Sequence, residues 1–156
     1  MALQSSAAAL SRDLKRISDK FDIDYNKVVR KTALDIHRNV VLRTPVQAEP
    51  KPGGRAAGSW GISEGTPGSG SLPEGTYGNP QSASQRFVSV RQGVMFQTLW
   101  IFNNLPYIEV LEFGLYPGSG PKTIAGFSTQ APSGMVRVSL AEQRTQTARD
   151  LRDVLR

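Results

Sequence analysis

The sequence of 156 residues contains no cysteine and a single histidine, His37. Without cysteine there is no disulfide, no thiolate ligand for a metal ion and no thiol nucleophile. One histidine is too few for a histidine metal cluster or for an acid–base system with several imidazoles. Most enzyme chemistries lose their usual residues, so we expect no catalytic residue, no metal site and no cofactor.

Long hydrophobic runs are also missing, because no stretch of about 18 apolar residues without charge occurs. The first 20 residues soon become charged and lack the apolar segment of a secretory signal. We therefore expect a soluble protein that stays where it is made and has no membrane partner. The length fits one domain, or one domain with an arm.

Basic residues outnumber acidic ones, 19 to 13, which gives a formal charge of +6 and a pI near 10. This balance favours an anionic neighbour, either nucleic acid or an acidic protein surface. The basic residues are spread over the helical segments and not massed in a tail, so ordinary solvated helix faces are the favoured explanation.

Apolar residues recur every three or four positions near the N-terminus and predict a helix over residues 3–21. The stripe consists of Leu3, Ala7, Leu10, Leu14, Ile17 and Phe21. Asp22 and Asp24 interrupt it, and either is suited to cap a second helix that starts there. The link is very short, so two arrangements stay open. The two helices are antiparallel, or one kinked helix projects residues 1–23 as an arm.

The second helix should end near Leu42 or Arg43, because Thr44 precedes Pro45 and is pushed away from helical geometry. Gly and Pro then make up 14 of the residues 49–80. We expect a long flexible loop region over residues 49–84, with a short extended piece around residues 59–62.

Two β-rich runs follow, residues 87–90 and 94–102, and the Gly-containing turn between them predicts a hairpin. Both faces of the second run are largely apolar. One face can meet the helices, whereas the other needs a loop, an arm or another subunit to cover it.

A short helix is expected over residues 106–113, ended by Gly114, followed by another loop over residues 115–133. The last segment starts at Ser133 or Gly134. Its β-branched beginning allows a strand, and from Leu140 onward it should be a basic amphipathic helix.

Three residues with possible chemistry are better explained structurally. Glu109 and Glu112 stand three apart, and without a histidine or third acid such a pair is usually a salt-bridge or capping feature. His37 adjoins an apolar position, and we interpret it as a half-buried structural histidine.

Nucleic-acid binding has some support from the sequence. Aromatic and basic residues stand in glycine-rich surroundings, namely Trp60, Tyr77 and Arg55, but no base-reading motif accompanies them.

These patterns predict an α+β fold, in which N-terminal helices and a C-terminal helix pack on a small antiparallel sheet with long Gly/Pro-rich loops. Residues 1–23 form a helix or arm, and residues 24–156 form one domain. Such a profile suits a subunit of an assembly better than an enzyme.

Three motifs, in order, resemble the tail-completion or neck proteins of long-tailed bacteriophages. The first is Arg43-Thr-Pro-Val46, followed after a gap by Gly54-Arg-Ala-Ala-Gly-Ser-Trp60. The second is Tyr107-Ile-Glu-Val-Leu-Glu-Phe-Gly114. The third is Ala131-Pro-Ser-Gly-Met-Val136, leading into the C-terminal helix. One departure is the inserted Gln47-Ala-Glu-Pro-Lys-Pro-Gly53, which lengthens a turn that relatives keep short.

The resemblance implies a non-enzymatic virion protein, assembled in the host cytoplasm, that completes the tail and joins it to the head. It implies a ring, expected to be a hexamer, beside the tail terminator or tail tube protein and the head-closure connector, with genomic DNA passing through the lumen. The expected assembly residues are Pro45, Arg55, Trp60, Tyr107, Glu112, Phe113, Gly114, Pro132, Gly134 and Met135. The alternatives are a tail terminator and a basic, non-specific nucleic-acid-binding module.

Overall fold

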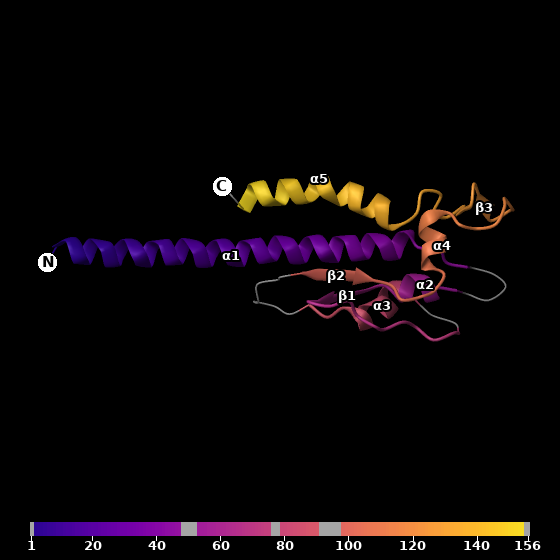
Figure 1. The fold of residues 1–156 in the computed structure, drawn as a ribbon, viewed down its shortest axis with the longest axis horizontal. Helices are drawn as coiled ribbons and strands as arrows, with labels where there is room; N and C mark the ends of the chain where they lie inside the picture. Colours follow the sequence, from indigo (N-terminus) through magenta and orange to yellow (C-terminus); the bar gives the residue numbers. More distant parts are fainter. Residues whose placement is uncertain (1, 48–52, 76–78, 91–97, 155–156) are drawn as a thin grey trace.

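The computed structural model describes residues 2–47, 53–75, 79–90 and 98–154, and these residues form an α+β fold. Two long helices lie side by side, α1 (Ala2–Arg43) and α5 (Val136–Val154), and a small antiparallel sheet packs on the other side of α1 (Figure 1). Short helices and a second small sheet gather at the end of α1 that is far from the N-terminus.

Helix α1 is continuous, so the prediction that a second helix begins at Asp22 or Asp24 is wrong. Neither carboxylate caps a new first turn. Asp24 instead forms an ion pair with Lys27 at 2.9 Å on the surface of the same helix. Of the two alternatives, the structure has the single helix, which Figure 1 shows straight and not kinked, and its first part, residues 2–24, projects past the rest of the molecule as an arm.

Helix α5 runs antiparallel to α1. Lys31 contacts Asp150 at 2.7 Å, and the hydroxyl groups of Thr32 and Thr147 lie 3.1 Å apart. Because α5 begins at Val136, the residues before Leu140 are helical, and the strand that their β-branched side chains allowed is not formed. β-branched residues are accepted here since contacts with α4 fix the start of the helix, as described below.

The main sheet pairs β1 (Gly61–Glu64) with β2 (Leu99–Phe102), with Ile62 opposite Ile101. The extended piece expected near residue 60 is thus a strand. The predicted hairpin turns at residues 91–93, which lie outside the described residues, so it stays a prediction. Among the described residues, β2 pairs with β1, and Val88 makes a parallel bridge to Ile62. Residues 94–97 of the predicted run lie outside the described residues.

The two faces of β2 are covered differently. Leu99 and Ile101 face a groove that α1 and α5 also line. On the opposite face Phe102 packs against Gly61 and Gly68, whose lack of a side chain makes room for the ring. Trp100 remains exposed, with its indole N–H donating to the Gly65 carbonyl. The chain's own loop therefore covers part of the second face.

The Gly/Pro-rich region holds more structure than the sequence predicts. It contains two short helices, α2 (Arg55–Gly58) and α3 (Pro80–Ser84). The Asn79 side chain caps α3 by accepting a hydrogen bond from the Gln81 N–H. A one-turn 3-10 helix, η1 (Gln85–Phe87), follows. Between Gly65 and Gly75 there is no regular element, yet Leu72 is buried.

The expected helix near residue 106 is α4 (Ile108–Phe113), and Gly114 ends it in the left-handed conformation, as predicted. The following loop contains a hairpin that was not predicted, β3 (Thr123–Ile124) and β4 (Phe127–Ser128). Its two turn residues, Ala125 and Gly126, both have positive φ, which matches the twist of tight hairpins.

Candidate functional site

The second and third motifs meet at the start of α5. The buried Glu112 carboxylate accepts hydrogen bonds from the backbone N–H groups of Met135 at 2.7 Å, Val136 at 2.8 Å and Arg137 at 3.1 Å. These N–H groups have no partner within the helix, and a negative charge at a helix N-terminus is stabilising. Glu112 therefore acts as a cap supplied by another helix, which confirms the capping interpretation.

Gly134 fits against Glu112. Its φ is +78°, and a Cβ at this position would lie 2.6 Å from the Glu112 carbonyl oxygen. Any other residue would suffer both backbone strain and a clash. The glycine of the third motif and the glutamate of the second are thus parts of one arrangement.

Arg137 completes this junction. Its guanidinium donates to the Glu112 carboxylate at 3.2 Å and to the Glu112 carbonyl at 2.8 Å. It also lies over the rings of Phe113, at 5.6 Å, and Phe127, at 5.9 Å. Sequence reasoning missed Arg137, because a basic residue in the first turn of a basic helix gives no distinguishing signal.

The two halves of the first motif meet at Trp60. Its ring is buried, and its Nε1–H donates to the Thr44 hydroxyl at 2.7 Å, which itself donates to the Val40 carbonyl at 2.6 Å. The sequence identifies Thr44 only as the residue before Pro45, which ends the helix. It also ties the end of α1 to the glycine-rich segment, and Trp60 anchors that segment as expected.

His37 binds the same tryptophan. Its Nε2 lies 3.1 Å from the Trp60 carbonyl oxygen, which accepts the hydrogen bond. Burial lowers the pKa of His37, and the contact with the carbonyl opposes this effect. The side chain is 2% exposed, so the structural role is correct while the expected half-burial is wrong.

Arg55 holds the loop that follows the first motif. Its Nε donates to the Leu72 carbonyl at 2.8 Å, and its guanidinium pairs with Glu74 at 3.2 Å. The Ser59 hydroxyl accepts from the Leu72 N–H, so Leu72 is fixed on both sides of its backbone. A Cβ on Gly58 would meet the Leu72 side chain at 2.6 Å, which explains the small residue there.

One hydrophobic core joins all three motifs. It contains Val40 and Val41 of α1, Ala56, Ala57 and Trp60 after the first motif, Leu105 and Leu111 around α4, and Ala131 and Met135 of the third motif. Segments more than 70 residues apart in the sequence therefore form a single buried unit.

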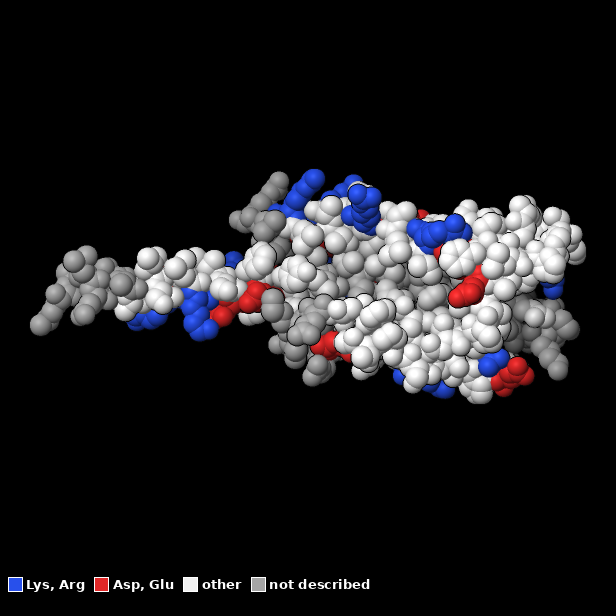
Figure 2. All heavy atoms as spheres, in the orientation of Figure 1, with Lys and Arg blue, Asp and Glu red and all other residues white. Residues whose placement is uncertain are grey.

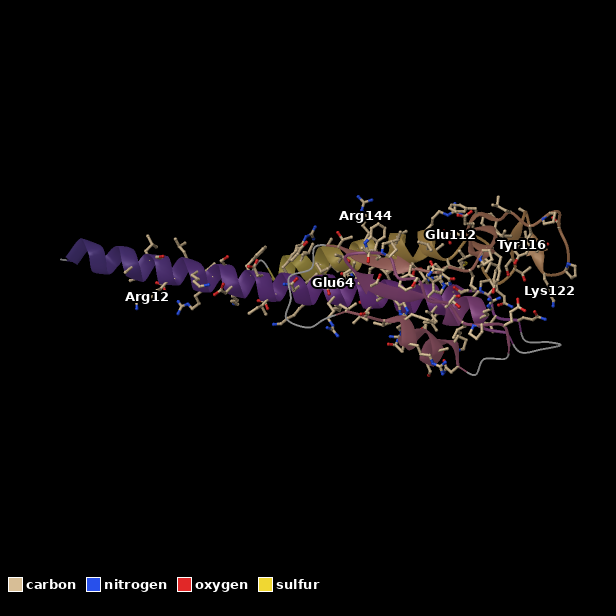
Figure 3. All side chains as sticks on the ribbon, turned by 60° about the horizontal axis from the view of Figure 1, so that its bottom comes forward. Arg12, Glu64, Glu112, Tyr116, Lys122 and Arg144 are labelled. Carbon is tan, nitrogen blue, oxygen red and sulfur yellow. The ribbon has the colours of Figure 1, made fainter. Side chains whose placement is uncertain are left out.

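A surface cleft of about 710 Å³ opens beside this core. Pro45, Arg55 and Tyr107 line it, together with Tyr116 and Lys122. Tyr116 and Lys122 lie at the end of the molecule far from the arm (Figure 3). Two basic side chains line the cleft, but Arg55 already pairs with Glu74 at 3.2 Å, so Lys122 is the basic lining residue for which the described residues give no ion pair.

Three expected site residues lie at the surface, namely Tyr107, Phe113 and Pro132. Phe113 is 56% exposed, so it is not one of the side chains that pack α4 against the core. It faces away because Leu111 and Glu112 occupy the buried side of this short helix. Pro132 is also exposed, in the turn before Gly134. Tyr77 lies outside the described residues.

Comparisons with family models, with curated proteins and with solved structures found no match to this chain. In the described ranges, no three His, Cys, Asp or Glu side chains gather so as to hold a metal ion. No helix among these residues has the length and apolar content needed to cross a bilayer. The arrangement of Trp60, Glu112 and Gly134 supplies structural contacts between segments.

Proposed function

We propose that this protein is a structural subunit of the neck or tail end of a long-tailed bacteriophage. It forms a ring, expected to be a hexamer, that completes the tail and joins it to the head connector, and DNA passes through the lumen. The virion is its place of action, and its neighbours are further copies of itself, the tail terminator or tail tube protein and the head-closure protein.

The observation that carries the proposal is the contact of Glu112 with Met135 and Gly134. These residues belong to the second and third motifs that resemble the tail-completion family. Motifs that interlock physically form one structural unit, so they support the resemblance more strongly than three independent short matches do.

The surface around the core supports an assembly role. Pro45, Arg55 and Tyr107, which the resemblance assigns to assembly, line the same cleft, and Lys122 adds an exposed basic side chain to it. We assign this cleft to contact with an acidic surface of a neighbouring subunit, since unlike charges favour specific association.

The proposal is tested by negative-stain microscopy and light scattering of the purified protein, alone and mixed with tail tubes. We expect rings of uniform diameter with a central channel that bind one end of the tube. Lys122→Glu reverses charge in the cleft and should reduce ring formation, whereas Arg86→Glu, an exposed residue elsewhere, should not. Absence of rings and of tube binding in the wild type would contradict the proposal.

A second candidate, a basic nucleic-acid-binding module, is favoured by the outer face of α5. Arg144, Arg149 and Arg152 are exposed there, and within the described part of the chain none of them has an ion pair. Arg144 points away from the helix into solvent (Figure 3). Tight DNA binding by a protein that neither forms rings nor binds tubes would favour this candidate.

A further inference from the structure

The arm of α1 carries an exposed apolar stripe, and the one ring contact given for it among the described residues is the stacking of Phe21 on Tyr25 of the same helix. Leu10, Leu14, Ile17 and Phe21 are 61%, 58%, 63% and 47% exposed. Beyond the end of α5, Figure 1 shows no other labelled element beside this part of α1. Four large apolar side chains in a row on one face of a helix are a mark of an interaction site.

The spacing of the stripe specifies the shape of its partner. The steps between Leu10, Leu14, Ile17 and Phe21 are four, three and four residues, the alternation of a and d positions in a heptad. Such a narrow seam fits the side of a second helix better than a flat surface. Asp24 takes the next d position and ends the seam.

The stripe lies on the side of α1 that α5 covers farther along. Leu14 and Thr32 are 18 residues apart, which is five turns at 3.6 residues per turn, and Thr32 touches Thr147 of α5. In Figure 2 the edge of the arm on the α5 side is mostly uncharged, while the basic residues lie mainly on the opposite edge. A helix on the stripe would therefore continue the line of α5, which is antiparallel to α1.

The charges beside the seam favour a second, antiparallel copy of the same arm. With Leu10 opposite Phe21 and Leu14 opposite Ile17, the g positions Asp13 and Lys20 of the two copies face each other twice, and the twofold axis relates these two pairs on one flank of the seam. Parallel arms would place Asp13 opposite Ser18 and create no ion pair. Antiparallel arms shifted by one heptad would place Asp13 opposite Asp13.

Asp13 is free to exchange its present partner. It contacts Arg16 of its own helix at 3.2 Å, and both side chains are more than half exposed. Surface pairs of this kind contribute little to stability.

We propose that two copies of this protein associate through antiparallel pairing of their α1 arms, with Leu14 of each copy packed against Ile17 of the other. The contact has a twofold axis and closes on itself, so it joins two copies and no more. This inference does not rest on the proposed function in the phage tail.

The first test is sedimentation equilibrium of the full-length protein and of Leu14→Asp. We expect the wild type to associate through the arm and Leu14→Asp to lose this association by at least tenfold in Kd. The melting curve of the domain should not change, since residue 14 lies outside the core. Leu115→Asp, an equally exposed leucine far from the arm, is the matched control. A wild type whose association is unaffected by Leu14→Asp, or that is monomeric at every concentration, overturns the proposal.

Orientation is tested by disulfide formation, which is unambiguous because the chain has no cysteine of its own. Antiparallel pairing predicts that Leu10→Cys and Phe21→Cys form a mixed disulfide when the two variants are combined. Parallel pairing predicts that each variant forms a disulfide only with itself, and that result overturns the proposal. The two positions are about 16 Å apart along the helix, beyond the reach of one disulfide.

The charge pairs are tested by reversal and restoration. Asp13→Lys should weaken association by about tenfold, and adding Lys20→Asp should restore it. Asp19→Lys makes the same change on the outer side of the arm and should have no effect. If the double variant is no better than Asp13→Lys, the register is wrong. Binding of the stripe to anionic lipid vesicles by a monomeric wild type assigns it to a membrane surface and overturns the proposal.

Discussion

The carboxylate of Glu112 lies 2.7 Å from the backbone nitrogen of Met135 and caps a helix to which it does not belong. We expect Glu112→Ala to lower the free energy of unfolding by about 2–3 kcal/mol, because three buried N–H groups lose a charged acceptor. Glu112→Gln should cost less, since one oxygen acceptor remains. Urea denaturation measures both effects.

Glu109 is the matched control for this experiment, since it stands on the same short helix but is exposed. Glu109→Gln should unfold at the wild-type urea concentration. Equal destabilisation by the two substitutions would show that the cap contributes nothing of its own. If Glu109→Gln unfolded like the wild type yet abolished infectious particles, a chemical role for that carboxylate would have to be considered.

Trp60 should be far more sensitive to truncation than Phe113. Trp60→Ala removes a buried ring and should cost about 3–5 kcal/mol, whereas Phe113→Ala removes an exposed ring and should cost about 1 kcal/mol or less. Trp60→Phe keeps most of the packing and loses the bond to Thr44, at about 1 kcal/mol. Thermal melting of the three variants checks this order, and a Phe113→Ala as unstable as Trp60→Ala would contradict it.

Stability should fall as the pH is lowered from about 7.5 to 5.5, because of His37. Burial holds the folded-state pKa of His37 below its ordinary value near 6.5, so the unfolded chain binds the proton first. The contribution of neutral His37 to the free energy of unfolding is fully present above the unfolded-state pKa of this residue. It is lost as the pH falls from the unfolded-state pKa to the lower folded-state pKa.

NMR gives the pKa directly, since the only imidazole signal of the sequence belongs to His37. Urea denaturation of His37→Gln should lack the part of the pH dependence that the wild type shows above pH 5.5. An imidazole pKa at or above 6.5 in the folded protein would refute the assignment.

The buried side chain of Leu72 should contribute to protecting its loop from proteases, together with the hydrogen bonds from Arg55 and to Ser59. We expect Leu72→Ala to speed subtilisin cleavage between residues 65 and 75, because glycine-rich backbone then loses its anchor. Leu115→Ala, at an exposed position, is the control. Residues 64–84 should also be cleaved more slowly in assembled particles than in the free subunit, and equal rates would contradict ordering by neighbours.

Any DNA binding should be independent of base sequence and steeply dependent on salt. Replacing Arg144, Arg149 and Arg152 by Gln should reduce the slope of log K against log[salt] by up to about 3, one for each lost phosphate contact. The same change at Arg12, Lys15 and Arg16 of the arm is the control. A preference above tenfold among unrelated duplexes would contradict the prediction.

Local patterns in the sequence were sufficient to predict the elements that local chemistry controls. Pro45 ends α1 where expected, Gly114 ends α4, and the apolar stripe from Leu10 to Phe21 is helical. Each of these features depends on residues that are close together in the chain. The fixed φ of proline ends α1, a left-handed glycine ends α4, and a repeat of 3.6 residues forms the stripe.

Contacts between distant segments could not be predicted. The pairing of β2 with β1 bridges more than 35 residues, and nothing in Leu99–Phe102 identifies Gly61–Glu64 as its partner. The capping role of Glu112 was one of two open interpretations, because its donors lie more than 20 residues away. The exposure of Phe113 depends on which side of a six-residue helix faces the core, and a single turn and a half carries too little periodicity to decide this.

The arm has a further consequence for the helix–coil equilibrium of α1. The helix of the arm extends from a turn of α1 that packing against α5 already fixes. Residues 2–24 therefore need no nucleation step, and the helix propagates along them one residue at a time. The contacts printed for this part of the arm lie within the helix, such as the exposed pairs Lys15–Asp19 and Asp13–Arg16, and these add little to helix propensity, so fraying proceeds inward from Ala2. Far-UV ellipticity should then rise with protein concentration, since a second arm would make that fraying cooperative and hold the last turns in place.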